Sequence, residues 1–167
     1  MYSRDIALSF TGHRTYRNQA DTALEEAVER FYARGFRFFL SGMAVGFDLA
    51  AAEAVLRCRA RRPDIRLVAV IPFEGQELRF AEEERRRFRR VRAAADEVVV
   101  LASAYRRGCY ALRNDYLTDC AAAVVAWYDG SPGGTRYTWR RAVRRGLETV
   151  NLCPAPAANA TCDATLF

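Results

Sequence analysis

Short apolar runs alternate with longer amphipathic segments along most of the chain. The apolar runs predict β-strands at Asp5–Phe10, Phe36–Leu40, Ile65–Ile71, Glu97–Leu101, Ala122–Trp127 and Leu147–Leu152. Apolar residues at helical spacing predict helices at Asn18–Arg34, Gly46–Arg61, Leu78–Ala94, Tyr110–Ala121 and Thr135–Arg145. This alternation is typical of a mostly parallel sheet with helices on both faces. We therefore predict a three-layer α/β/α fold with about six strands.

The length of 167 residues suits one domain. We expect residues 1–152 to form that domain, and residues 153–167, which include Pro154 and Pro156, to be a loosely held tail. The chain enters its first strand without a recognisable signal sequence, and no apolar run is long enough to cross a bilayer. These features predict a cytoplasmic protein with no membrane partner.

All the positive charge comes from arginine, because none of the 26 basic residues is lysine. This usage indicates a compositional bias, so the net charge of +6 is a weak argument for nucleic-acid binding. It also excludes chemistry that needs a lysine amine, such as a Schiff base. The five cysteines form no C-x-x-C pair and lie far in sequence from His13, so we predict free thiols and no metal site.

Two glycine-bearing loops follow predicted strands and precede predicted helices. In parallel sheets, ligands bind at this edge, beyond the carboxyl ends of the strands. In the first loop, Ser41–Gly46, the glycines Gly42 and Gly46 let the backbone approach a ligand, and the amides that begin the next helix would face an anion. The alternative is a tight turn that only packs the helix against the strand.

The second loop is Asp129–Thr135. Gly133 and Gly134 expose backbone amides there, and Thr135 supplies a hydroxyl that would cap the helix or face a phosphate. A flexible turn with a capping threonine is the alternative. Two such loops at one edge of a sheet favour a site for a phosphate-bearing ligand such as a nucleotide.

Other residues at this edge are candidates for ligand contacts. His13 would bind a ligand or transfer a proton, or else bond to a backbone carbonyl. Arg14 and Arg113 are phosphate candidates, and Asn114 is a candidate for reading a base or ribose, although Arg113 and Asn114 would equally suit a helix cap and a salt bridge. The remaining candidates are Gly12 after the first strand, Ser41, Met43 and Asp48 around the first loop, Phe73 and Gln76 after the third strand, and Asp129 in the second loop.

The charged run Glu82–Arg92 suggests a solvent-facing helix rather than a nucleic-acid site. Its acids come early and its bases late, as the helix dipole prefers. Glu82–Arg86 and Glu83–Arg87 have the spacing of favourable ion pairs. A basic patch for nucleic acid is the minority interpretation.

Several of these motifs, taken in order, resemble the YpsA-like family of the SLOG superfamily, which is named for the DprA/Smf and LOG proteins. The resemblance runs from about Ile6 to Val150. Its motifs are Thr11-Gly12-His13-Arg14, Ser41-Gly42-Met43-Ala44-Val45-Gly46-Phe47-Asp48 with Ala52-Glu53, Ile71-Pro72-Phe73 with Gln76, Arg113-Asn114 with Asp119, and Gly133-Gly134-Thr135.

The resemblance implies a Rossmann-like fold, a bacterial and cytosolic protein, and a site for a nucleotide or an ADP-ribose-like ligand. No cofactor follows with certainty. The ligand loops would contain Gly42, Gly46, Gly133, Gly134 and Thr135, and Asp48, Glu53, Arg113 and Asn114 match further motif positions. Some members of the branch are linked to cell division or stress, so a sensor or regulatory domain with a protein partner is compatible. Helix faces rich in Ala and Tyr would allow a homodimer.

Two alternative functions remain open. LOG enzymes are phosphoribohydrolases whose G-T-x-x-E segment supplies a catalytic glutamate, whereas Thr135 here is followed by Arg136-Tyr137-Thr138-Trp139, without a carboxylate. Asp48 and Glu53 are the catalytic candidates that would replace it. DprA relatives bind single-stranded DNA, and stacking would fall to Tyr105, Tyr110, Tyr116, Trp127 or Tyr128. We consider this the less favoured partner.

Overall fold

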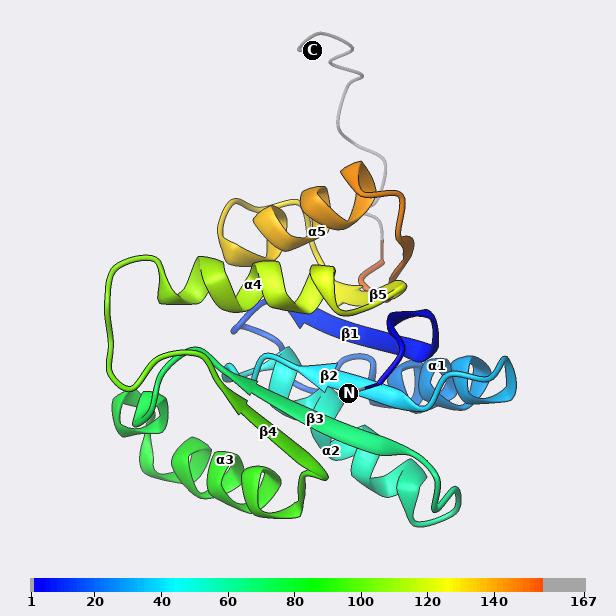
Figure 1. Cartoon of the computed structure of the whole chain (residues 1–167), viewed down its shortest axis with the longest axis horizontal. Coiled ribbons are helices and arrows are strands. Elements are labelled where there is room, and N and C mark those ends of the chain that lie inside the picture. Colours follow the sequence, from blue (N-terminus) through cyan, green and yellow to red (C-terminus); the bar gives the residue numbers. More distant parts are fainter. Residues whose placement is uncertain (1, 155–167) are drawn as a thin grey trace, which may run out of the picture.

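Six parallel strands form a single sheet in the order β4-β3-β2-β1-β5-β6 (Figure 1). The strands are β1 (Ala7–Gly12), β2 (Phe38–Ser41), β3 (Arg66–Ile71), β4 (Glu97–Val100), β5 (Ala123–Trp127) and β6 (Glu148–Asn151). The computed structural model describes residues 2–154, so most of the tail predicted at 153–167 lies outside the described residues. The predicted α/β fold is confirmed, with every strand pair parallel.

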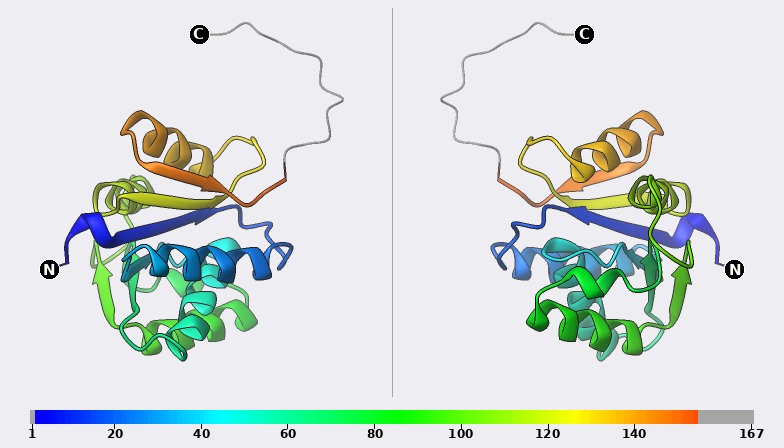
Figure 2. Two further views of the ribbon diagram at one scale, coloured as in Figure 1. Left: turned by 90° about the vertical axis from the view of Figure 1, so that its right-hand side faces the viewer. Right: turned by 90° about the vertical axis from the view of Figure 1, so that its left-hand side faces the viewer.

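Helices cover both faces of this sheet (Figures 1 and 2). They are α1 (Asp21–Ala33), α2 (Phe47–Arg59), α3 (Glu82–Ala94), α4 (Cys109–Asp119) and α5 (Gly134–Arg144). The first three lie on one face, and α4 and α5 lie on the other. The chain therefore builds outward from β1 to β4, crosses back, and adds β5 and β6 on the other side of β1. The strand order reverses between β1 and β5, where sheets of this type bind their ligands.

The central strands read as nearly continuous apolar runs because both of their faces are buried. The larger core lies beneath α1, α2 and α3 and includes Phe10, Phe31, Phe39 and Phe47. A smaller core lies on the other face of the sheet and includes Leu117 of α4. The register between β1 and β5 places Gly12 beside Trp127, so both strands end at the same level.

The charged helix α3 begins later than the sequence predicts. The predicted start at Leu78 is wrong, because residues Gln76–Arg79 form a separate 3-10 helix. Gly75, in the left-handed region at φ +83°, begins this turn. Phe80 then adopts an extended backbone and packs its ring 5.7 Å from that of Phe88, which interrupts the helix.

The ion pairs on α3 agree only in part with the predicted spacing. Glu82 pairs with Arg86 at 3.0 Å, as predicted. The predicted Glu83–Arg87 pair is wrong: Arg87 instead binds Glu84 at 3.0 Å and Glu53 of α2 at 2.8 Å. The charge of Arg87 therefore joins two helices rather than facing the solvent alone.

Within residues 2–154, no helix has both the length and the apolar character that crossing a membrane requires. In the same range no cluster of three or more His, Cys, Asp or Glu side chains has the arrangement of a metal site. Cys58, Cys109, Cys120 and Cys153 are free thiols, and Cys162 lies outside the described residues.

Candidate functional site

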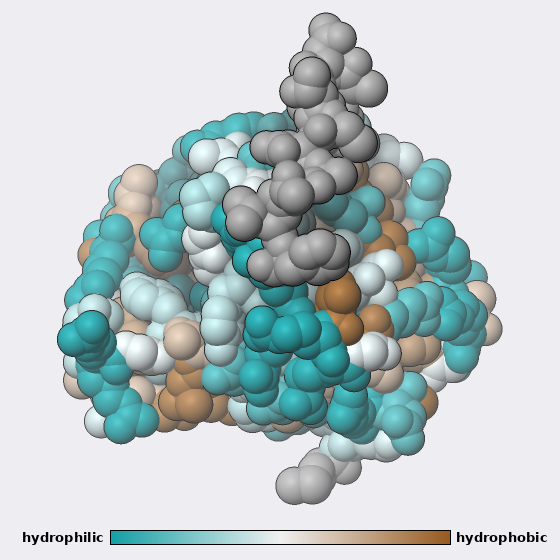
Figure 3. All heavy atoms as spheres, turned by 90° about the horizontal axis from the view of Figure 1, so that it is seen from above, coloured by the Kyte–Doolittle hydropathy of each residue, from teal (hydrophilic) through white to brown (hydrophobic). Residues whose placement is uncertain are grey.

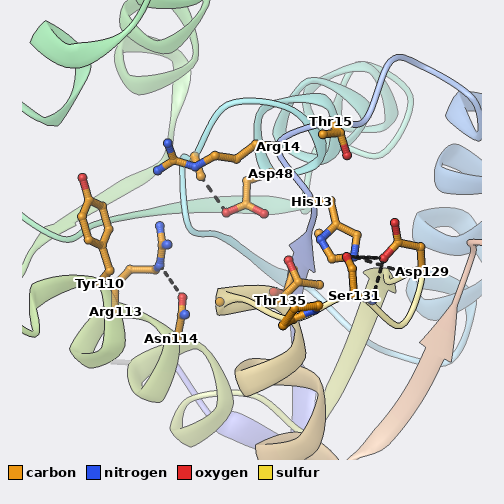
Figure 4. A pocket seen from close by; sticks show the side chains of 15 residues that line it. His13, Arg14, Thr15, Asp48, Tyr110, Arg113, Asn114, Asp129, Ser131 and Thr135 are labelled. Carbon is orange, nitrogen blue, oxygen red and sulfur yellow. Dashed lines mark hydrogen bonds and ion pairs between the residues drawn. The ribbon is translucent and has the colours of Figure 1, made fainter.

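A pocket of about 530 Å³ lies where β1 and β5 end. It is lined by Thr11, Gly12, His13, Arg14, Thr15, Ala44, Asp48, Tyr110, Arg113, Asn114, Asp129, Ser131, Pro132, Gly134 and Thr135. Tyr110, Arg113 and Asn114 project from α4 on one side, and His13, Asp129 and Ser131 lie on the opposite side (Figure 4). Both glycine-bearing loops border this pocket, at the reversal of strand order.

Asp48 and Arg113 are charged side chains buried at the pocket wall, with relative exposures of 4% and 7%. Asp48 lies in the first turn of α2, and its carboxylate accepts a hydrogen bond from the Ala44 amide at 3.4 Å. The Arg113 guanidinium donates to the Gly42 carbonyl and, at 2.7 Å, to Asn114 Oδ1. Arg113 therefore supports the wall rather than acting as an exposed phosphate clamp.

Gly42 is required for this arrangement. A Cβ atom at this position would lie 2.7 Å from the Asp48 carboxylate and 2.9 Å from the Arg113 side chain, both closer than van der Waals contact allows. The first loop thus uses one of its glycines to admit two charged side chains, a role that the glycine spacing alone does not reveal.

Burial and opposite charge act against each other on this pair. Burial raises the pKa of Asp48 to about 6, although the positive charges of Arg113 and Arg14 and the amides of Ala44 and Gly12 oppose the rise. Burial likewise lowers the pKa of Arg113, against the attraction of Asp48. A carboxyl group that faces a pocket and titrates near neutral pH is typical of functional sites.

The amino end of α2 differs from the expected anion site. The first amide of the helix, at Phe47, donates to the His13 carbonyl at 3.3 Å. The carboxylate of Asp48 is the negative charge at this helix end. Because the protein supplies its own anion there, this end is a poor place for a phosphate.

The amino end of α5 is open by contrast. Its first helical hydrogen bond runs from the Tyr137 amide to the Gly133 carbonyl at 3.1 Å. Among the described residues, no hydrogen-bond acceptor faces the amides of Gly134, Thr135 and Arg136, and no side chain caps the helix. The Thr135 hydroxyl also makes no hydrogen bond within residues 2–154. Gly134 and Thr135 line the pocket, so the open helix end and the Thr135 hydroxyl border it, an arrangement that suits an anion.

His13 is held by the second loop rather than by a backbone carbonyl. Its Nε2 atom lies 2.8 Å from the Asp129 carboxylate and 3.2 Å from the Asp129 amide. Asp129 also accepts from the hydroxyl of Ser131 and, at 2.9 Å, from its amide, and these hydrogen bonds lower the pKa of Asp129. Since one nitrogen faces both Asp129 and Ser131, the three residues do not form a Ser-His-Asp relay, which uses both ring nitrogens.

Arg14 is the exposed arginine of the pocket. It forms no ion pair with a carboxylate of residues 2–154, and its side chain extends over Asp48 toward the side of Tyr110 (Figure 4). Close packing fixes the turn that carries it, since a Cβ on Gly46 would lie 2.7 Å from the carbonyls of His13 and Arg14. Arg14 is therefore the charged group best placed to meet a ligand.

Several residues predicted for the site lie outside the pocket lining. Ser41 and Met43 are buried beneath the first loop, where the Ser41 hydroxyl donates to the Asp48 carbonyl at 2.8 Å. Phe73 and Gln76 are buried after β3, and both amide atoms of Gln76 lack a partner among the described residues. Gly42, Gly46 and Gly133 shape the loops without lining the pocket.

Glu53, a catalytic candidate, faces α3 and not the pocket. Burial alone would raise its pKa, but the hydrogen bonds and charge of Arg87 outweigh that effect and lower the pKa. The two side chains form a bidentate contact with distances of 3.0 and 2.8 Å. This geometry assigns Glu53 a structural contact between α2 and α3.

The predicted ligand set omits five pocket residues: Thr11, Thr15, Ala44, Ser131 and Pro132. It also omits Tyr110, which the sequence suggested only for base stacking. Tyr110 precedes Arg113 by three residues, so both lie on one face of α4, a signal that spacing provides. Thr11 belongs to the motif Thr11–Arg14, whereas nothing in the local sequence distinguishes the other four.

The sequence matches the YpsA family, described as the YspA SLOG family, over residues 6–150. The chain belongs to this family. It is similar to the uncharacterized SPbeta prophage-derived protein YoqJ of Bacillus subtilis, with 30% identity over 110 residues, 59% of this chain and 64% of YoqJ. It is also similar to a UPF0398 protein of Halalkalibacterium halodurans, with 29% identity over 126 residues, 74% of this chain and 67% of that protein.

Two solved structures share the fold at low sequence identity. The DNA processing protein A (DprA) of Streptococcus pneumoniae superposes with a TM-score of 0.65 and 17% identity, over 93% of this chain and 52% of that one. DprA of Helicobacter pylori, described for its single-stranded DNA binding mode, superposes with a TM-score of 0.65 and 14% identity, over 87% of this chain and 64% of that one. Because this chain spans only about half to two thirds of these proteins, the likeness concerns the fold and not their activities.

Proposed function

We propose that the pocket binds a nucleotide or a nucleotide-derived phosphate compound, in a domain that serves as a sensor or regulator in the cytoplasm. The observation that carries the proposal is the open amino end of α5, where three amides and the Thr135 hydroxyl lack partners among the described residues. A phosphate there would gain hydrogen bonds and the favourable helix dipole. Arg14 would neutralise its charge from across the pocket.

The rest of the pocket suits the remainder of a nucleotide. Asn114 and Asp129 offer amide and carboxylate groups for a ribose, and Tyr110 offers an aromatic ring for a base. The volume of about 530 Å³ lies within the range of small-molecule sites. The ligand would therefore place its phosphate at α5 and its base toward α4.

A thermal-shift screen over nucleotides, ADP-ribose and related dinucleotides tests this proposal. A ligand present at about 100 times its Kd adds about 2.7 kcal/mol to the free energy of unfolding, which raises the melting temperature measurably. The ligand should be recovered intact after incubation. If none of these compounds shifts the melting temperature, the proposal is wrong.

Asp48 supports a second candidate, a hydrolase acting on a nucleotide derivative. Thr138 stands where LOG enzymes carry glutamate, and its buried hydroxyl donates to the Gly134 carbonyl at 3.0 Å. Of the two carboxyl groups that line the pocket, Asp129 has its pKa lowered by the hydrogen bonds of Ser131, which leaves Asp48 as the better candidate for proton transfer. Its pKa of about 6 suits proton transfer near neutral pH. Release of free base and ribose phosphate, lost in Asp48→Asn, would favour this candidate over simple binding.

A further inference from the structure

Arginines without an ion pair gather beside the pocket. Every arginine of α3 lies within 4.0 Å of a carboxylate, so the charge of that helix is largely neutralised within the protein. Arg14, Arg17 and Arg79 have no such partner among residues 2–154 and are exposed to solvent. Other arginines without an ion pair in the described part of the chain lie elsewhere, such as Arg106 and Arg107 after β4. Arg14, Arg17 and Arg79 differ from them in lying together, at the loops that follow β1 and β3.

These three arginines line a second hollow of about 470 Å³. Arg14 borders both hollows, and the first loop continues from one into the other, with Ala44 in the pocket and Val45 in the groove. We call this second hollow the Arg79 groove. Of its two glutamates, Glu84 is paired with Arg87, so three unpaired arginines face the single unpaired Glu83.

Arg79 is held in place before any ligand arrives. Its guanidinium lies 4.2 Å from the centre of the Tyr105 ring and 5.4 Å from that of Phe73. Phe73 in turn contacts Tyr110 of the pocket, with ring centres 5.8 Å apart. Stacking restricts the side chain without consuming its charge, so less entropy is lost when it binds an anion.

We propose that the Arg79 groove is a second subsite, which binds the distal phosphate and sugar of a nucleotide extended through a diphosphate. The inference rests on the proposed function of the pocket, which would hold the nucleotide itself. Arg14, which borders both hollows, bridges the two phosphates, and Arg79 and Arg17 receive the distal part. The chain thus prefers a phosphate-linked, two-part ligand to a mononucleotide.

The test is calorimetric titration of AMP and of ADP-ribose into the wild-type chain, Arg79→Gln and Arg66→Gln. Arg66 begins β3 at the opposite edge of the sheet and also lacks an ion pair among the described residues, so it controls for the loss of one charge. We expect wild type to bind ADP-ribose about tenfold more tightly than AMP, as one charge-assisted contact provides. Arg79→Gln should erase that preference and change AMP affinity less than about twofold.

Other results would show whether the second subsite alone or the pocket proposal as well is wrong. If AMP binds but ADP-ribose binds no more tightly, or if Arg66→Gln has the same effect as Arg79→Gln, the second subsite is wrong and the pocket proposal stands. If neither compound binds, both proposals fail together. A ten-residue thymidine oligonucleotide that binds in an Arg79-dependent and strongly salt-dependent way, without a preference for ADP-ribose over AMP, would replace the groove by a single-strand site. Melting temperatures of both variants control for folding.

Discussion

At the scale of single residues, the site depends on two buried charges and the glycine that makes room for them. Asp48 and Arg113 are almost inaccessible, and Gly42 lies against both. Burial disfavours the charged form of each side chain more than their mutual attraction favours it. Substitutions here therefore test the packing of the pocket wall apart from any ligand.

Gly42→Ala should lower the free energy of unfolding by about 1–3 kcal/mol, because the added methyl group overlaps the side chains of Asp48 and Arg113. Gly134→Ala is the matched control, since its new Cβ would meet only Asn114 Nδ2 at 3.4 Å. Urea denaturation of both variants measures the difference. Equal stabilities of the two variants would show that the side chains around Gly42 accommodate the methyl group without loss of stability.

The buried carboxyl of Asp48 should make stability depend on pH. Its pKa rises from 3.8 to about 6 on folding, so the folded state favours the protonated form. The resulting stabilisation is present below about pH 4 and is lost as the pH rises through about 6. Between pH 4 and 7, wild type should lose up to about 3 kcal/mol relative to Asp48→Asn. Thermal unfolding across this range measures it, and a constant difference between the two proteins would contradict the assignment.

At the scale of elements, the two glycine-bearing loops have different roles. In sequence they look alike, each being a glycine turn before a helix. The structure distinguishes them through one side chain: α2 carries Asp48 in its first turn, whereas α5 has no acidic residue there. The sequence shows that contrast between the two helix ends. The role of Asp48, however, depends on the Ala44 amide and on Arg113, whose positions beside its carboxylate only the fold reveals.

Thr135→Val should weaken AMP binding about tenfold, because it removes the hydroxyl that would donate to the phosphate at α5. Thr22→Val, in the exposed first turn of α1, makes the same chemical change away from the pocket. Fluorescence or calorimetric titration gives the two affinities. If both variants bind like wild type, the phosphate does not use this hydroxyl.

Glu53→Gln tests the contact between α2 and α3. The change weakens the ion pair with Arg87 and should reduce the free energy of unfolding by about 1 kcal/mol, while ligand affinity stays within about twofold of wild type. Glu26→Gln on α1, where no ion pair is present among the described residues, is the control for charge. A loss of affinity at unchanged stability would show instead that Glu53 contributes to the ligand site.

At the scale of the whole molecule, periodicity and turn residues were enough to predict six strands, five helices and the edge of the sheet at which the pocket lies. They could not predict the break before α3, which depends on Phe80 packing against Phe88, nor the burial of Gln76. Ser131 and Pro132 reach the pocket only because β1 and β5 are neighbours. Local sequence determines the elements, whereas their juxtaposition determines the pocket.

The expected homodimer remains a prediction. Seen from the side of α5, the surface is mostly hydrophilic, and its hydrophobic spots are small and separate (Figure 3). Tyr137 and Val143 of α5 are 41% and 54% exposed. Scattered apolar side chains of this kind are common on monomeric proteins and do not mark an interface.

The most direct test of the central claim is an NMR titration of the ¹⁵N-labelled chain with AMP. If the phosphate binds at the amino end of α5, the amide signals of Gly134, Thr135 and Arg136 should shift most, followed by that of Asn114. The amides of Phe47 and Leu49, which already have protein acceptors at the start of α2, should move little. Largest shifts at α2, or no saturable shifts at all, would contradict the account.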